Sequence, residues 1–319
     1  MSANIKRIYL RLTFIVLTAI ALIILMHYSI YYGVVTKLLL EYRYARVYSV
    51  VLSGLILGIT GSYLQGCLRN PLVDHYILGI GSGALFAVYL SILLKGYDIA
   101  LAPLSAIIGG LSALALTILI AEAIGGSDTA YVLAGLGVNS LFSGASILLT
   151  YIISAKYPFA IHLLIGSFVT ATPKYYPLLS SALIILLVSY PFLAKPLNTL
   201  VLGDQYAMQL GYNPIIYRRI AIVLAGISAS IIVSLYGLIG FIGLVSPHIA
   251  RFLLKSMDHR FTIPLSGLTA SILLLITDDF ARIFLSEVVG EVPAGAIVSV
   301  FGAPFFLFLI VSRFKRSLR

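Results

Sequence analysis

The chain has 319 residues, of which 61% are hydrophobic and only 10% are charged, and its formal net charge is +10. Its mean hydropathy of +1.07 lies far outside the range of soluble proteins. Because a membrane-spanning helix takes about 20 apolar residues, the sequence has room for about ten spans and for no soluble catalytic domain. The single cysteine, Cys67, excludes an intrachain disulfide and a multi-cysteine metal cluster.

Apolar runs separated by polar or Gly/Pro-marked connectors predict ten transmembrane helices. They cover residues 8–28, 44–67, 78–94, 100–121, 131–154, 175–194, 217–236, 239–254, 262–284 and 296–312. No small-x-small cleavage site follows the first run, so we expect it to be retained and not removed as a signal peptide. The predicted fold class is all-α, a polytopic membrane protein with one transmembrane domain over residues 1–319.

The distribution of basic residues predicts the orientation. With ten spans and an inside N-terminus, most of the 21 Lys and Arg residues fall on one side, which the positive-inside rule assigns to the cytoplasm. We therefore expect a multi-pass protein of the cell membrane with both termini cytoplasmic. Topology and the anionic headgroups of the lipid bilayer account for the positive charge, and nucleic-acid binding is not expected.

The connector between the sixth and seventh spans carries its own helix signals. Asp204 is a good N-cap residue, Gly211 is a good residue after a C-cap, and Asn213-Pro214 stops or restarts the chain. The pattern predicts a helix of about two turns with Tyr206 and Leu210 on one face. So short a helix is marginal alone in water, so it packs either on its own bundle or against a cytoplasmic partner.

The apolar run 238–255 is broken by Ser246-Pro247-His248 and ends with Arg251 and Lys255. The proline removes a backbone donor, which predicts that the helix is interrupted at Pro247. His248 is expected to satisfy freed backbone groups or to face a partner, because the five histidines form no spaced set of metal ligands. The glycine-rich run 79–83 lacks the Lys-Ser/Thr of a phosphate loop, and close helix packing explains it better.

Several ordered segments together resemble one family over nearly the whole chain. They are Gly237-Leu-Ile-Gly-Phe-Ile-Gly-Leu-Val-Ser-Pro-His-Ile-Ala-Arg251, Asp258-His-Arg260, Pro264-Leu-Ser266, Gly302-Ala-Pro-Phe305, Arg69-Asn-Pro-Leu72, Leu133-Ala-Gly135, Leu202-Gly-Asp204 and Leu210-Gly-Tyr-Asn213. They are similar to the permease subunits of type II ABC importers, the group that carries iron-siderophores, haem and cobalamin. The chain departs from the family pattern at Arg43-Tyr-Ala-Arg46 and at His75, and it has no tryptophan.

The resemblance implies a homodimer of ten-helix subunits, two cytoplasmic ATPase subunits and an extracytoplasmic substrate-binding protein. ATP and Mg would be bound by the ATPase, so this chain would hold no cofactor and no metal and would not itself be an enzyme. Consistent with this, the sequence contains no G-x-x-x-x-G-K-[ST] motif.

The resemblance also assigns roles to four groups of residues. Coupling to the ATPase would use the segment 198–215, with Leu202, Gly203, Asp204, Tyr206, Leu210, Gly211 and Asn213. Docking of the binding protein would use Arg43, Arg46 and Arg282; a cytoplasmic gate would use Asn70, Leu72, Asp128 and Thr129; and the structural signature comprises Gly243, Pro247, His248 and Arg251.

Ordinary structural roles are alternatives to these four functional assignments. Each arginine could be a snorkelling anchor, Asp278 could pair with Arg282 one helical turn away, and Thr129 could cap its helix.

An ion-coupled secondary transporter or channel is the alternative function. It would need ionisable residues at mid-membrane, whereas all eleven Asp and Glu residues fall at or near predicted span ends. An ATP-driven importer of a ferric siderophore, haem or cobalamin is therefore favoured, with an iron chelate first. Oxyanions also occur as substrates among relatives, and the sequence does not distinguish these substrates.

Overall fold

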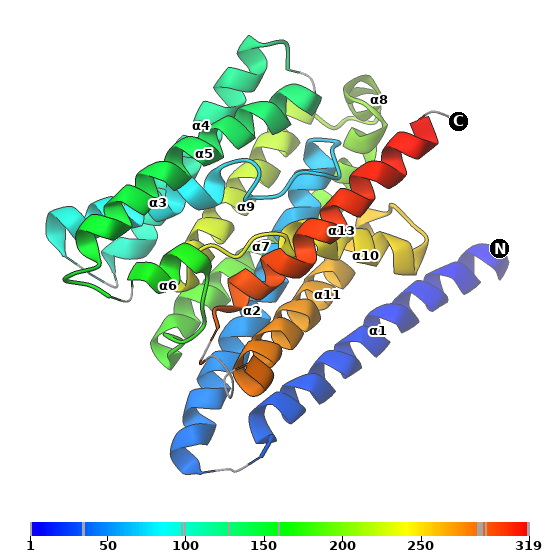
Figure 1. Cartoon of the computed structure of the whole chain (residues 1–319). Coiled ribbons are helices and arrows are strands. Elements are labelled where there is room, and N and C mark those ends of the chain that lie inside the picture. The colour runs from blue at the N-terminus through cyan, green and yellow to red at the C-terminus, as the bar shows by residue number, and fades with distance from the viewer. Residues whose placement is uncertain are drawn as a thin grey trace.

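The computed structural model describes residues 2–33, 36–96, 98, 100–126, 128–158, 160–285, 290 and 292–317, which form a helical bundle (Figure 1). Its elements are α1 (Ser2–Tyr31), α2 (Lys37–Cys67), α3 (Ile80–Lys95), α4 (Leu101–Ala123), α5 (Asp128–Ile153), α6 (Ala160–Ile165), the 3-10 turn η1 (Pro173–Tyr175), α7 (Tyr176–Leu202), α8 (Asp204–Gln209), α9 (Pro214–Tyr236), α10 (Ile242–Leu254), α11 (His259–Asp279), the π-helical turn η2 (Phe280–Leu285) and α13 (Ala294–Ser317).

A helix occurs at each of the ten predicted spans, which confirms an all-α polytopic fold. In the part of the chain that the structure describes, six helices are long and apolar enough to cross a membrane, and α3 and α10 are shorter apolar helices. The last predicted span extends to Ser317, and the ninth ends in the π-helical turn. The short helices α6 and α8 lie in connectors between spans.

The central helix of the bundle is α2, whose most apolar stretch is 89% buried. Its glycines at one-turn spacing let neighbouring helices approach its backbone. A Cβ added to Gly54 would lie 2.4 Å from the Cα of Ser271 on α11, and one added to Gly61 would lie 2.0 Å from the Gly243 carbonyl oxygen on α10. Membrane helices that meet through small residues gain close van der Waals contact, so this face fixes α2 against α10 and α11.

The eighth span is the single helix α10, and the chain breaks before it, at the predicted boundary between the seventh and eighth spans. Helix α10 begins at Ile242 and continues through Pro247 to Leu254, so the predicted interruption at Pro247 is wrong. The chain leaves helical geometry between Gly237, with φ of +79°, and Phe241, with φ of +63°. Gly237 is required here because a Cβ would lie 2.0 Å from the Leu163 carbonyl oxygen, which also accepts a 3.0 Å hydrogen bond from the Leu238 amide.

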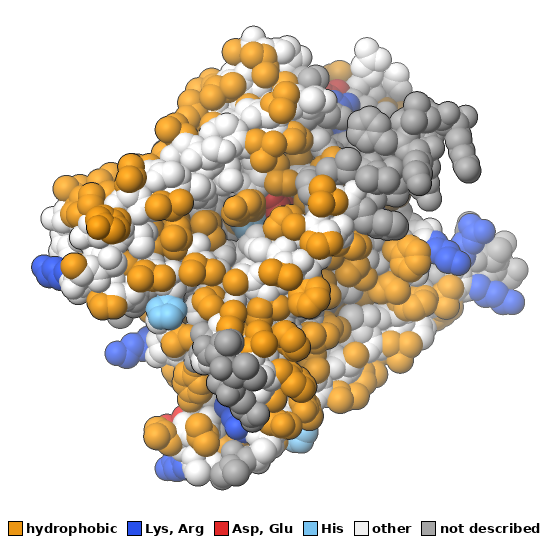
Figure 2. Space-filling view, in the orientation of Figure 1, with side chains coloured by type: hydrophobic (Ala, Val, Ile, Leu, Met, Phe, Trp, Pro, Cys, Tyr) orange, Lys and Arg blue, Asp and Glu red, His pale blue; other side chains and the backbone are white. Residues whose placement is uncertain are grey.

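The outer surface of the bundle is largely apolar, as Figure 2 shows for one face. The apolar stretch of α1 is only 6% buried and that of α5 only 28%. Soluble monomers rarely expose apolar surface on this scale, so these faces are suited to lipid or to another membrane subunit. Both ends of the chain and α8 lie at one end of the bundle, and the α1–α2 connection lies at the other (Figure 1).

Candidate functional site

The short helix α8 occupies the predicted coupling segment, but its cap differs from the prediction. Gly203 is the N-cap, with φ of 125°, and Asp204 is the first helical residue. The Asp204 carboxylate instead forms an ion pair with the Arg218 guanidinium at 2.8 Å and lies 3.6 Å from the Arg69 guanidinium. Charged partners from other elements hold Asp204, so its predicted N-cap role is wrong.

The C-terminal signals of this segment are confirmed. Gly211 follows the C-cap Leu210 with a positive φ of 83°. The Asn213 side chain accepts hydrogen bonds from the amides of Ile215 and Ile216 and so begins α9. The connector is therefore a compact helix-turn with fixed ends.

Four exposed apolar residues in and beside α8 form a surface that we call the α8 knob: Leu202 at the end of α7, Tyr206 and Met208 of α8, and the C-cap Leu210. Their exposed fractions are 66%, 45%, 57% and 53%, whereas Ala207 between them is fully buried and attaches the helix to the bundle. Figure 1 shows α8 standing at the end of the bundle near the C-terminus. A capped helix with an exposed apolar face can insert into a groove on a partner protein.

Arg218 on α9 joins the α8 knob to the end of the central helix. Its guanidinium donates to the Asp204 carboxylate at 2.8 Å and to the carbonyl oxygen of Cys67, the last residue of α2, at 3.1 Å. Arg69, two residues later, takes a left-handed conformation with φ of 53° and brings its own charge to Asp204. Sequence reasoning missed this role of Arg218, because Cys67, one of its two partners, lies 151 positions away.

The predicted gate residues lie in two connectors. In the turn after α2, the buried side chain of Asn70 accepts a 3.0 Å hydrogen bond from the amide of Leu72, which is half-buried. Helix α5 begins at Asp128, so exposed Thr129 lies in the first turn and is not the N-cap, which corrects its predicted capping role. The side chain of Asp128 lies outside the described residues, and the gate role of this set stays a prediction.

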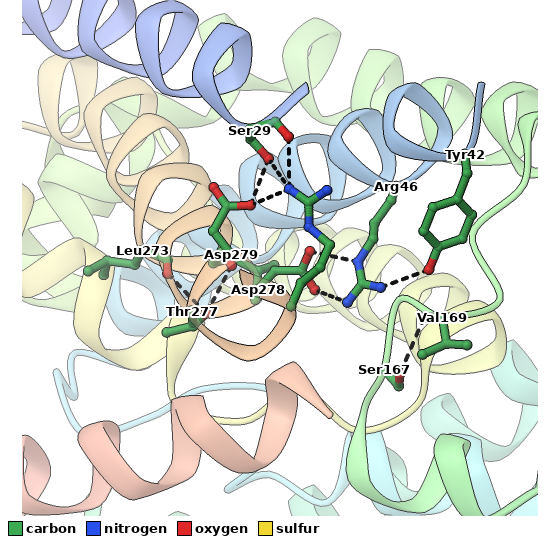
Figure 3. A network of polar contacts seen from close by, with 11 residues as sticks. Ser29, Tyr42, Arg46, Ser167, Val169, Leu273, Thr277, Asp278 and Asp279 are labelled. Atoms are coloured by element: carbon green, nitrogen blue, oxygen red, sulfur yellow. Dashed lines mark hydrogen bonds and ion pairs between the residues drawn. The ribbon is translucent and has the colours of Figure 1, made fainter. Parts of the chain in front are cut away.

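The three predicted docking arginines lie at the opposite end, where they contact residues of α1, α2 and α11. Figure 3 shows Arg46 beside Asp278 in this region. Arg46 donates two 2.8 Å hydrogen bonds to the Asp278 carboxylate, and both side chains are only 1% exposed. Arg46 also donates to the Tyr42 hydroxyl at 2.8 Å. In this structure Arg46 is a buried, paired charge, and its role in docking stays a prediction.

Arg282 pairs with Asp279 at 2.7 Å and not with Asp278 as predicted, because Asp278 is engaged by Arg46. Arg282 also donates to the backbone carbonyl and the hydroxyl of Ser29 on α1, each at 2.8 Å. Arg43 is half-buried and donates to the Ile30 carbonyl oxygen at 3.0 Å. The arginines at this end therefore tie α1, α2 and α11 together within one chain.

The structural signature around Pro247 is completed by Gln65 of α2. Pro247 has no amide hydrogen to donate one turn back, and the Gln65 side-chain amide donates instead to the carbonyls of Gly243 at 3.4 Å and Leu244 at 3.2 Å. A His248 ring nitrogen also lies 2.8 Å from the Leu244 carbonyl, as expected of a residue that satisfies backbone groups. Arg251 then donates to the Gln65 side-chain oxygen at 2.6 Å.

The turn between α10 and α11 is fixed by Asp258, which caps α11 by accepting from the Arg260 amide. Its carboxylate also accepts from the Asn198 amide at 2.8 Å and from the Arg260 guanidinium at 2.7 Å. Burial by itself raises the pKa of Asp258, but the hydrogen bonds from Arg260 and Asn198 outweigh it and lower the pKa to about 2. Asp258 is therefore ionised at neutral pH.

Comparison with known proteins identifies the family. Residues 7–312 match the model of the FecCD transport family. The chain belongs to this family. It is 34% identical over 288 residues to the hemin transport system permease protein HmuU of Yersinia pestis, covering 87% of this chain and 84% of the relative. It is 33% identical over 291 residues to the iron-uptake system permease protein FeuC of Bacillus subtilis, covering 87% and 85%.

A solved structure of a metal-chelate type ABC transporter in an inward-facing conformation matches this FecCD chain with a TM-score of 0.79. The two are 28% identical, and the match covers 94% of this chain and 99% of the other. These findings confirm the predicted ABC importer permease. The chain is a membrane permease subunit, and ATP hydrolysis belongs to a separate subunit.

Proposed function

We propose that this permease is the translocating subunit of an ATP-driven importer for a metal chelate, with an iron chelate favoured. The names of the hemin and iron-uptake relatives support this substrate class, as does the metal-chelate transporter that shares the fold. The assembly we propose is a homodimer with two cytoplasmic ATPase subunits, which bind ATP and Mg, and an extracytoplasmic binding protein. Both termini would then be cytoplasmic, on the side of α8.

The observation that carries the coupling role is the connection from the α8 knob to the end of α2. The knob is exposed and apolar, and Arg218 links Asp204 directly to the carbonyl oxygen of Cys67. A partner that displaces α8 therefore pulls on a charged contact to the central helix. In this proposal ATPase closure moves α8, and Arg218 passes the displacement to the turn that contains Asn70 and Leu72.

A charge in the α8 knob tests the ATPase contact. We expect Leu210→Asp to abolish co-purification of the ATPase subunit and ATP-dependent uptake in proteoliposomes, because a carboxylate cannot enter an apolar groove. Met257→Asp is the matched control, since Met257 is also exposed, at 61%, but lies outside α8. If the Leu210 variant assembles and transports like the Met257 variant, α8 is not the coupling helix.

The Arg218 link is tested by separating ATP hydrolysis from transport. Arg218→Gln should leave the complex assembled but lower uptake per ATP hydrolysed, because the contact to Asp204 is lost. Arg218→Lys should recover part of the ratio through its remaining charge, although it lacks the fork that reaches both acceptors. An unchanged ratio in Arg218→Gln would contradict transmission through this residue.

The substrate is tested with radio-iron in a ferric hydroxamate, with haem and with cyanocobalamin as separate probes. The absorption spectrum of ligand co-purified with the binding protein distinguishes these three classes. Uptake that follows an ion gradient and needs no ATPase subunit would instead support the alternative of an ion-coupled transporter. Uptake of a metal-free oxyanion alone would contradict the metal-chelate assignment.

A further inference from the structure

A cavity of about 540 Å³ lies between the N-terminal part of α1 and the C-terminal end of α10. Three of its lining residues are the cations Arg7, Arg11 and Lys255. A second cavity, of about 270 Å³, shares Arg7 and Arg11 and adds Arg260. We call the two together the basic groove. The larger cavity lies within the range of about 300–1,000 Å³ that is typical of pockets for organic ligands.

The charge of the basic groove has one sign. Among the residues that the structure describes, no Asp or Glu lines either cavity. Arg260 is paired with Asp258 at 2.7 Å, but no ion pair to Arg7, Arg11 or Lys255 occurs in the described parts of the chain. The Arg11 guanidinium lies 5.3 Å from the ring centre of Phe261, which positions it at the groove without neutralising it.

The rest of the basic groove is apolar. Leu10 and Phe14 of α1 and Leu253 and Leu254 of α10 line the larger cavity. The apolar stretch of α1 is only 6% buried, so this side of the groove is open to the bilayer. Figure 2 shows Lys and Arg side chains gathered at the free end of α1, which Figure 1 places at the same end of the bundle as α8.

We propose that the basic groove binds an anionic phospholipid. The phosphate lies among Arg7, Arg11 and Lys255, and the acyl chains run along Leu10 and Phe14. Two features select this occupant: the cations complement a negatively charged headgroup, and the apolar walls complement acyl chains at the depth where the headgroup region meets the hydrocarbon. A free phosphate ion matches only the first feature, and an uncharged lipid matches only the second.

This lipid has a structural consequence for the permease. Helix α1 diverges from α10 toward its N-terminus (Figure 1), and the cavity separates the two helices there. A lipid in the groove fills that gap and holds α1 to α10. The position of α1 then depends on the anionic lipid content of the leaflet on the α8 side.

The experiment uses the full chain in detergent, with phosphatidylglycerol and phosphatidylcholine of identical acyl chains as probes. Native mass spectrometry measures how much of each lipid is retained, and thermal unfolding measures stabilisation. The groove variant is Arg7→Gln/Arg11→Gln. The control variant is Lys195→Gln/Arg219→Gln, which removes the same charge at two exposed cations outside the groove.

We expect the native chain and the control variant to retain phosphatidylglycerol over phosphatidylcholine. The groove variant should lose about thirtyfold in affinity for phosphatidylglycerol, as expected when two cations near an anionic headgroup are removed. Equal loss in both variants would overturn the proposal, because it would indicate general surface charge. Equal retention of the two lipids by the native chain, or full stabilisation by inorganic phosphate alone, would also overturn it.

Discussion

We expect a single substitution in the buried pair of Arg46 and Asp278 to lower the free energy of unfolding more than the other substitutions considered below. Two hydrogen bonds of 2.8 Å join the groups, and both side chains are 1% exposed. Asp278→Asn removes the carboxylate charge that accepts both of these hydrogen bonds from the buried Arg46. Breaking a buried pair in this way lowers the free energy of unfolding by about 3–5 kcal/mol.

A double variant separates the interaction energy of the Arg46–Asp278 pair from the cost of burying each charge. Arg46→Met/Asp278→Leu removes both charges and refills the space with apolar side chains, so it also removes the cost of burying the ions. We expect the double variant to unfold at nearly the same denaturant concentration as the native chain. The coupling energy between the two sites should then be several kcal/mol, about the cost of one broken pair.

Equilibrium unfolding in mixed micelles is the assay, with Asp279→Asn as the matched control. Asp279 pairs with Arg282 at the same end of α11, but that arginine side chain is 13% exposed and has the Ser29 oxygens as further partners. Asp279→Asn should therefore cost less than Asp278→Asn. A loss below about 1 kcal/mol for Asp278→Asn, typical of a solvated surface pair, or a double variant as unstable as the two single variants combined, would refute the reasoning.

Three further substitutions have expected outcomes. Gly61→Ala should destabilise the fold by about 1–3 kcal/mol through overpacking, because the new Cβ would lie 2.0 Å from the Gly243 carbonyl oxygen. Gly137→Ala is the control and should be neutral in the same unfolding assay, because its Cβ would meet no atom within 4 Å. Gln65→Leu removes the side-chain donor to the Gly243 carbonyl, which Pro247 cannot replace, and should lower stability by about 1–3 kcal/mol in thermal unfolding. The pKa of Asp258 is about 2 in the folded chain and about 3.9 in the unfolded chain. The ionised carboxylate therefore adds its full contribution to the free energy of unfolding above about pH 3.9, and this contribution is lost as pH falls toward 2. Stability differences between the native chain and Asp258→Asn should therefore shrink between pH 5 and pH 2.5.

Features encoded in contiguous residues were predictable from the sequence. Long apolar runs gave the positions of all ten spans, and Gly211 with Asn213-Pro214 gave the end of α8 and the start of α9. The break between Gly237 and Phe241 falls at the predicted boundary between the seventh and eighth spans, but α10 begins at Ile242, three residues later than predicted. The interruption predicted at Pro247 does not occur, because the helix continues through the proline. Backbone contact with Leu163 sets the break, and hydropathy carries no signal of that contact.

The polar contacts of the candidate sites were predicted less well, because their partners are distant in the sequence. Asp278 was expected to pair with Arg282 one turn away, but it pairs with Arg46, which is 232 positions away. An ion pair between residues four apart on a helix stabilises it by only about 0.5 kcal/mol. The buried ion pair of Asp278 with Arg46 outweighs this local preference. The glycine face of α2 could have been found, since Gly54 and Gly58 follow the small-xxx-small spacing of packed membrane helices.

These contacts make α2 the element that joins the two ends of the permease. Its 31 residues form one uninterrupted helix, about 46 Å long at 1.5 Å per residue. At one end Arg218 binds the carbonyl of Cys67 and reaches Asp204 of α8, and at the other Arg46 binds Asp278 of α11. Between them the glycine face touches α10 and α11 backbone to backbone, where no flexible side chains absorb a shift. A displacement that begins at α8 therefore acts on the packing of α2 against α10 and α11 before it reaches the lipid-facing helices.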